Sequence, residues 1–377
     1  MSYKLYTLSN HVCTLNNSAI RFFDGYNPLN LPPGTMRVKA IAYPYTGPVT
    51  AGGATFDSYT LVSANGITGV YDIYKSGGDF EKLLYNSNNV IEILGANTTD
   101  ITNMAAMCYG CTKLSAVTLF DTRTVTDMSH MFNWCSGLSS IPLYDMSKVT
   151  DASVMFNNCT ALSSVPHFNT SSLTATRSMF SQCRNLADVP QLDTRNVVDM
   201  YNMFGSCDSI TSVPWMDTHN VTSMAAMFGA CDKLRTVPQF DTSNVIAMEG
   251  MFAVCSSLSS VPDFDTSNVI YTYRMFAGCL NLSSAPNLDT SNVTNAHEMF
   301  NGCTSLTSVP QYNTTNMSSV GQMFRNCYNV ESGALDLYQQ MSTQANPPVD
   351  HGAAFSACGR DTVNGAAELA QIPDGWK

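Results

Sequence analysis

Residues 240–262 read FDTSNVIAMEGMFAVCSSLSSVP, and close copies of this stretch recur every 24 residues along most of the chain. One column of the alignment holds Cys in ten successive copies, without an insertion or deletion. These are Cys111, Cys135, Cys159, Cys183, Cys207, Cys231, Cys255, Cys279, Cys303 and Cys327. Met stands four residues before each Cys, and Phe follows that Met in nine of the ten copies. Regular self-similarity at periods of about 20–50 residues indicates stacked repeats, so we predict a solenoid.

The pattern inside one copy predicts the shape of a coil. The apolar residues from Val125 to Cys135 follow one another at helical spacing, which favours a short helix or helical turn. Residues 138–142 are β-permissive and end at a Pro, which favours one brief parallel strand. The Asp-Thr-x-Asn segment that follows is typical of a turn. The fold class is therefore an α/β-type repeat solenoid in which each 24-residue coil shelters the next.

Outside the regular copies the chain divides into three segments. Residues 1–75 lack the repeat and are predicted to form a small β domain that serves for attachment. Its expected strands are 36–43, 59–63 and 70–74, with turns such as Ala51-Gly-Gly between them. Residues 76–330 form the solenoid, with a degenerate first coil that begins at Phe80. Residues 331–377 repeat the Met-Phe-x-x-Cys pattern after an insertion at 335–344 with helical character, which predicts a C-terminal cap.

The composition excludes several classes of function. The 377 residues include 18 Lys and Arg against 29 Asp and Glu, a net charge of −11, so a phosphate backbone would be repelled and no nucleic acid is expected as a partner. No apolar run reaches the roughly 18 residues of a membrane span, so no membrane insertion is expected. The first residues lack the apolar core of a secretory signal, which predicts a chain that is not exported by the ordinary signal route.

The repeated Cys and Asp columns each allow two interpretations. Stacking would bring successive Cys within disulfide range, but their position between Phe and Leu favours buried structural thiols. The Asp column could suggest calcium, but one Asp per coil favours turn capping over a site with converging oxygens. The six His are scattered, and no common hydrolase, metalloprotease or nucleotide motif is present. We expect no catalytic residues, no metal and no cofactor.

Two sets of variable positions are candidates for binding. The first stripe consists of the two residues before each Met-Phe, and the second stripe consists of the residue between the Pro and the next large apolar residue. Because repeated residues specify the fold, variable ones are free to specialise, although a solvated surface without function is the simpler alternative. The candidate binding residues are His130, His167, Arg177, Tyr201, Trp215, Tyr273, Arg274, His297 and Glu298. Trp215 is the best single anchor, because Trp is enriched at binding hot spots.

The run from Phe240 to Val261 resembles the repeat of BspA-like leucine-rich-repeat surface proteins, in particular their DTSNVT-x-M-xx-MF-xx-C-xx-L subtype. The likeness covers about residues 80–330. It implies a leucine-rich-repeat-like curved solenoid with a short parallel sheet and a role in adhesion or surface recognition. The chain departs from the family's surface members in lacking an export signal or anchor, and its Pro after Val is more regular. The ending from Asn364 to Lys377 resembles that of similar repeat proteins encoded by tailed phages of gut anaerobes.

These resemblances favour a non-enzymatic phage virion component, made in the host cytoplasm and displayed on the head, neck or tail. The expected partners are other virion proteins and a host-surface glycan or protein, within a homo-oligomer or a larger assembly. Two alternatives stay open, a bacterial cell-surface adhesin and an intracellular protein-binding scaffold.

Overall fold

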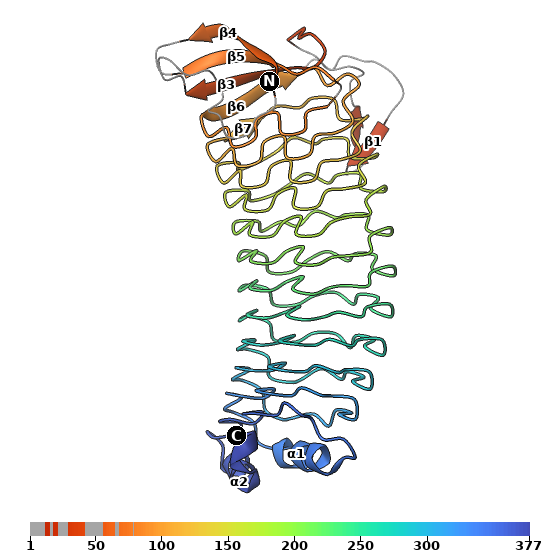
Figure 1. Cartoon of the computed structure of the whole chain (residues 1–377), viewed down its shortest axis with the longest axis vertical. Coiled ribbons are helices and arrows are strands. Elements are labelled where there is room, and N and C mark those ends of the chain that lie inside the picture. The colour runs from red at the N-terminus through yellow and green to blue at the C-terminus, as the bar shows by residue number, and fades with distance from the viewer. Residues whose placement is uncertain (1–11, 16–17, 22–28, 42–55, 65–67, 78) are drawn as a thin grey trace.

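The computed structural model describes residues 12–15, 18–21, 29–41, 56–64, 68–77 and 79–377. Its solenoid is a long stack of coils, with a β-sheet at the N-terminal end and two helices at the C-terminal end (Figure 1). The stack confirms a repeat fold. Within the described residues, no helix is both long and apolar enough to cross a membrane.

A five-stranded sheet forms the N-terminal end of the stack. Its strands, in the order β4-β5-β3-β6-β7, are β4 (Ser58–Ala64), β5 (Thr68–Tyr74), β3 (Thr35–Ile41), β6 (Val90–Ala96) and β7 (Ala116–Val117). Only β6 and β7 pair in parallel. A separate antiparallel hairpin joins β1 (Val12–Leu15) and β2 (Ser18–Arg21).

Alternating burial along β3 and β5 fits the period of two expected for a strand with one covered face. The three strands predicted from the sequence correspond to β3, β4 and β5. Residues 42–43 of the first prediction and the Ala51-Gly-Gly turn lie outside the described residues. Since β6 belongs to the first coil, this sheet continues directly into the solenoid.

The short helix predicted for each coil is absent, and a run of tight turns takes its place. Alternate N–H groups donate to the next coil, as Phe132 does to the carbonyl of Met155 at 2.9 Å. The residues between them donate three residues back within the same coil, as Cys135 does to Phe132 at 3.0 Å. A helix would need every N–H for its own turn. The left-handed φ of Trp134 (63°) and of its equivalents also breaks the helical path.

The parallel strand predicted at residues 138–142 of each coil forms at the N-terminal end of the stack, where β6 and β7 pair at the equivalent positions, but it is wrong as a general feature of the later coils. Parallel pairing instead forms single-residue bridges in the column just before Met-x-x-Met-Phe, from Asn103↔Asp127 to Ser319↔Asp350. At the predicted position two isolated bridges occur among the described coils, Ser164↔Asp188 and Ser308↔Ser332. The Pro that closes this segment has no N–H to donate, which limits the ladder there.

The interior is a set of columns of identical side chains. The Met, Phe and Cys columns are fully buried, and successive Phe rings from Phe132 to Phe355 stack with centroids 5.3–6.0 Å apart. Each repeat thiol from Cys111 to Cys327 donates to a carbonyl 27 residues earlier, as Cys135 Sγ does to Cys108 at 3.0 Å. All twelve described cysteines are free, so the thiol interpretation is confirmed over the disulfide ladder. Burial raises the pKa of thiols such as Cys135, and that of Cys255 to about 12.

Polar ladders close the turns on the outside of the stack. The Asp column caps the turn, since Asp241 Oδ1 accepts the N–H of Ser243 at 3.1 Å. The Asn column ties neighbouring coils together, since Asn244 Nδ2 donates to the carbonyl of His219 at 2.7 Å. The buried Thr of the motif does the same, as Thr242 Oγ1 donates to Asp265 at 2.8 Å. These bonds confirm the turn interpretation of the Asp column.

The two ends of the solenoid close differently. At the N-terminal end the N–H of Leu84 donates to the carbonyl of Met107, the same bond that links later coils. At the C-terminal end Phe324 donates to Ala354, so the last coil is complete although the chain first detours through α1 (Ala334–Thr343). Helix α2 (Val363–Gln371) and a 3₁₀ turn (Asp374–Trp376) then cover the final layer.

Candidate functional site

The nine candidate residues occupy two stripes, and the structure separates them into small groups. In the first stripe, Arg177 lies 4.0 Å above the ring of Tyr201 and forms an ion pair with Asp199 at 3.3 Å. His130 is half-buried and its Nδ1 lies 3.0 Å from Asn133 Nδ2. Desolvation lowers the pKa of His130, which favours its neutral form. These residues are satisfied within the chain.

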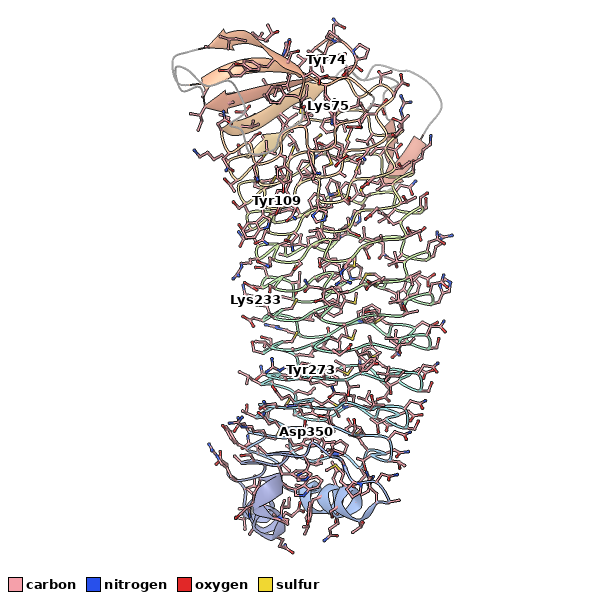
Figure 2. The ribbon with its side chains drawn as sticks, viewed as in Figure 1. Tyr74, Lys75, Tyr109, Lys233, Tyr273 and Asp350 are labelled. Atoms are coloured by element: carbon pink, nitrogen blue, oxygen red, sulfur yellow. The ribbon has the colours of Figure 1, made fainter. Side chains whose placement is uncertain are left out.

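The remaining group of the first stripe surrounds Tyr273, which Figure 2 labels in the lower half of the stack. Arg274 pairs with Glu298 at 2.7 Å, and His297 meets Tyr273 edge to face at 5.8 Å. Glu298 is only 8% exposed, so this candidate lies beneath the surface. Both ring nitrogens of His297 are buried without a hydrogen-bond partner. Tyr273 and Arg274 are the members of this group that face solvent.

The second stripe contains the most prominent exposed aromatic side chain. Trp215 is 57% exposed, and it borders an open pocket with a volume of about 390 Å³. Three successive coils line this pocket, and the lining includes Gln191, Asp193, Arg195 and Asp217. His167 lies at its border, where its Nδ1 accepts the N–H of Gln191 at 3.2 Å. Trp215 and His167 are thus brought to one place.

Local backbone explains why the pocket walls are polar and aromatic. The segment around Trp215 forms no regular helix or strand, and its side chains alternate between surface and core over residues 215–218. Met216 is buried, whereas Trp215 points outward and Asp217 is half-exposed. The preceding coil repeats the pattern with buried Leu192 and an outward Gln191.

Hydrogen bonds fix the charges in the pocket. Arg195 donates to both oxygens of Asp193, from Nε at 2.9 Å and from Nη2 at 2.8 Å. Asp217 Oδ1 lies 2.7 Å from His219 Nδ1. This bond with His219 lowers the pKa of Asp217, so the carboxyl group is ionised at neutral pH. The pocket therefore holds two carboxylates and one guanidinium.

Sequence reasoning did not place Asp193, Arg195 and Asp217 in the candidate site. Both Asp belong to the repeated column, where their turn-capping role was sufficient explanation. The available signal was their spacing of two residues from Gln191 and Trp215, which places them on the same side of an extended segment. Within the described residues, no group of three or more His, Cys, Asp or Glu gathers in a way that could hold a metal ion.

One known protein family matches most of the chain. The family described as "Mycoplasma protein of unknown function, DUF285" matches residues 79–188, 174–287 and 222–337, which together span most of the chain. The chain belongs to this family. The DUF285 match coincides with the stack of coils and excludes the N-terminal strands β3, β4 and β5. A search of curated proteins gives no match.

Solved structures similar to this DUF285 chain include two bacterial leucine-rich-repeat proteins. One is the T. pallidum leucine-rich-repeat protein, with 17% identity, a TM-score of 0.33, and coverage of 56% of this chain and 85% of that chain. The other comes from Eubacterium ventriosum, with 16% identity, a TM-score of 0.34, and coverage of 70% and 82%.

Proposed function

We propose that this DUF285 protein is a non-enzymatic recognition protein that binds a macromolecular partner through the second stripe at Trp215. The observation that carries the proposal is an indole 57% exposed beside a pocket that three coils line. Burial of a large apolar side chain stabilises a protein or complex by about 1.5–3 kcal/mol relative to leaving the side chain exposed to water. A partner that covers Trp215 would recover this free energy, as at many protein interfaces.

A second part of the proposal concerns where the protein functions. We propose that the protein acts as a virion component of a tailed phage, with other virion proteins and a host-surface protein or glycan as partners. The support is the resemblance of the C-terminal residues, from Asn364 to Lys377, to those of similar repeat proteins encoded by tailed phages. Mass spectrometry of purified particles tests this assignment, because a structural component is present at stoichiometric amounts. Detection in the cell envelope without phage induction would favour a bacterial adhesin instead.

The test of the binding site compares two exposed Trp residues. Purified full-length protein is incubated with intact cells of the bacterium that carries the gene, and bound protein is measured after sedimentation. We expect Trp215→Ala to lose most of the binding and Trp134→Ala to retain it. Trp134 is a matched control because it is 48% exposed and does not line the pocket. Equal binding by both variants and the wild type would refute a recognition role for Trp215.

A further inference from the structure

The groups of the Trp215 pocket that are not bonded within the chain indicate which kind of ligand the pocket binds. Most polar groups of the pocket are already occupied within the chain. The Gln191 amide donates to the carbonyl of Trp215 at 2.7 Å, and Arg195 occupies both oxygens of Asp193. The hydroxyl groups of Thr170 and Thr194 donate to main-chain carbonyls of the next coil.

Two of the groups that remain available in the pocket can together contact a cation. One is the exposed indole of Trp215, whose π face attracts cations. The other is Asp217 Oδ2, since the bond with His219 uses Oδ1 and the described residues place no donor on the second oxygen. Both groups lie on the solvent side of one short segment, with the buried Met216 between them. An aromatic face beside a carboxylate oxygen is complementary to an organic cation.

The surroundings of the pocket also favour a cation. The next two members of the Asp column, Asp241 and Asp265, are capped by Ser243 and Ser267 rather than by a basic residue. Hydrogen bonds from these Ser residues lower the pKa of both carboxyl groups, so the ridge beyond Trp215 carries unneutralised negative charge at neutral pH. The whole chain has a net charge of −11. Long-range attraction therefore acts on basic partners.

We infer that the Trp215 pocket binds an arginine side chain of a protein partner, with the guanidinium stacked on the indole and paired with Asp217. This inference rests on the proposed recognition role of Trp215. A planar guanidinium suits both contacts better than an ammonium, because it stacks flat and donates from its edge. The chain itself uses this geometry elsewhere, since Arg177 lies 4.0 Å above Tyr201 and Arg360 lies 3.8 Å above Tyr328.

Nuclear magnetic resonance of the full chain provides a direct test, because the sequence contains only three Trp and therefore three indole N–H signals. The Trp215→Phe variant identifies the relevant signal. The protein is titrated with acetyl-Gly-Arg-Gly-amide, with the same peptide containing citrulline, and with maltotriose. We expect the arginine peptide alone to shift the Trp215 signal in a saturable way. The Trp134 signal should stay in place.

Two matched variants separate the local carboxylate from the general negative charge. Asp217→Asn should raise the dissociation constant of the arginine peptide about two- to fivefold, the size expected for one exposed ion pair. Asp241→Asn removes one charge from the same column but leaves the pocket lining unchanged, and should have a smaller effect. Equal effects of the two variants would contradict the pairing with Asp217.

The remaining outcomes distinguish this inference from the proposed function. Equal shifts with the citrulline peptide, or a shift with maltotriose alone, would overturn the arginine assignment while leaving Trp215 as a recognition residue. No shift with the arginine peptide would also overturn the assignment. Loss of cell binding in Trp215→Ala is measured separately, so the recognition role stands or falls on its own experiment.

Discussion

Phe228 and Trp215 are large aromatic residues in successive coils of the stack, yet Phe228 is fully buried and Trp215 is 57% exposed. Phe228 stacks between Phe204 at 5.8 Å and Phe252 at 5.7 Å, so the coils before and after it supply the same residue. Trp215 has Gln191 and Gln239 at the equivalent positions. In the interior, stacking against the same side chain in both adjacent coils restricts which residue type can occupy a position. Positions of the second stripe are not restricted in this way, so one coil can carry a residue that differs from those of the others.

The interior columns should be closed to solvent as a unit. We expect the twelve described thiols to react with a disulfide reagent at least ~1000-fold more slowly in the native protein than in urea, because reaction requires an opening that costs several kcal/mol. Burial also raises the pKa of thiols such as Cys135, which lowers the reactive thiolate fraction. Time-resolved labelling with mass spectrometry gives the rate at each Cys. Fast labelling of one column member would show that its coil is not sheltered.

Removal of one interior ring should cost more than any change on the second stripe. Phe228→Ala leaves a cavity between two stacked rings, so we expect the free energy of unfolding to fall by about 3–5 kcal/mol. Urea denaturation followed by circular dichroism measures this loss. Phe228→Leu should lose less, because it retains most of the buried apolar volume. A loss below about 1 kcal/mol for the Ala variant would mean that neighbouring coils collapse into the space.

The residue immediately before each repeated Cys lies between the interior and the second stripe in its degree of variation. Its backbone conformation is repeated from coil to coil, but its side chain varies. Val254 has a left-handed φ of 62° and is 52% exposed, a conformation that is unfavourable for a β-branched residue. Asn158 and Asn326 occupy the same column with φ of 60° and 62°. We expect Val254→Asn to stabilise the protein by about 1 kcal/mol, measured as an increase in the urea midpoint.

The reverse change provides the control for this prediction. Gly278, the next member of the column, has φ of 75°, and an added Cβ would lie 3.4 Å from Val254. Gly278→Val should therefore destabilise the protein, because it adds a β-branched residue in the left-handed region. If both changes shifted stability in the same direction, backbone strain would not explain the preference of this column.

The sequence predicted the columns of the coil better than its backbone. The 24-residue period identified the buried Met, Phe and Cys and the turn-capping Asp, because each follows from residue type and spacing. The helix prediction failed at residues such as Phe132, because apolar spacing of three and four fits both a helix and consecutive turns. The deciding factor is the hydrogen bond from Phe132 to Met155 in the next coil, which no local pattern reveals.

The candidate site shows the same contrast between residues that the sequence could predict and residues that it could not. Trp215 could be chosen because it is exceptional within its column, whereas Asp193 and Asp217 could not, since their column is uniform. Glu298 appeared variable and polar, and therefore suitable for binding. Its pairing with Arg274 at 2.7 Å and its burial depend on the lateral packing of two coils. Variation identifies where a surface is free to change, but only packing shows which side chains reach solvent.

The smallest effect on stability is expected at Trp215. Trp215→Ala should change the free energy of unfolding by less than about 0.5 kcal/mol, because a side chain that is 57% exposed contributes little to the fold. The hydrogen bond that Gln191 makes to residue 215 uses the main-chain carbonyl and survives the change. Urea denaturation of Trp215→Ala beside Phe228→Ala measures the contrast directly. A loss above about 2 kcal/mol at Trp215 would assign the indole to the fold, and its exposure would then no longer argue for a partner.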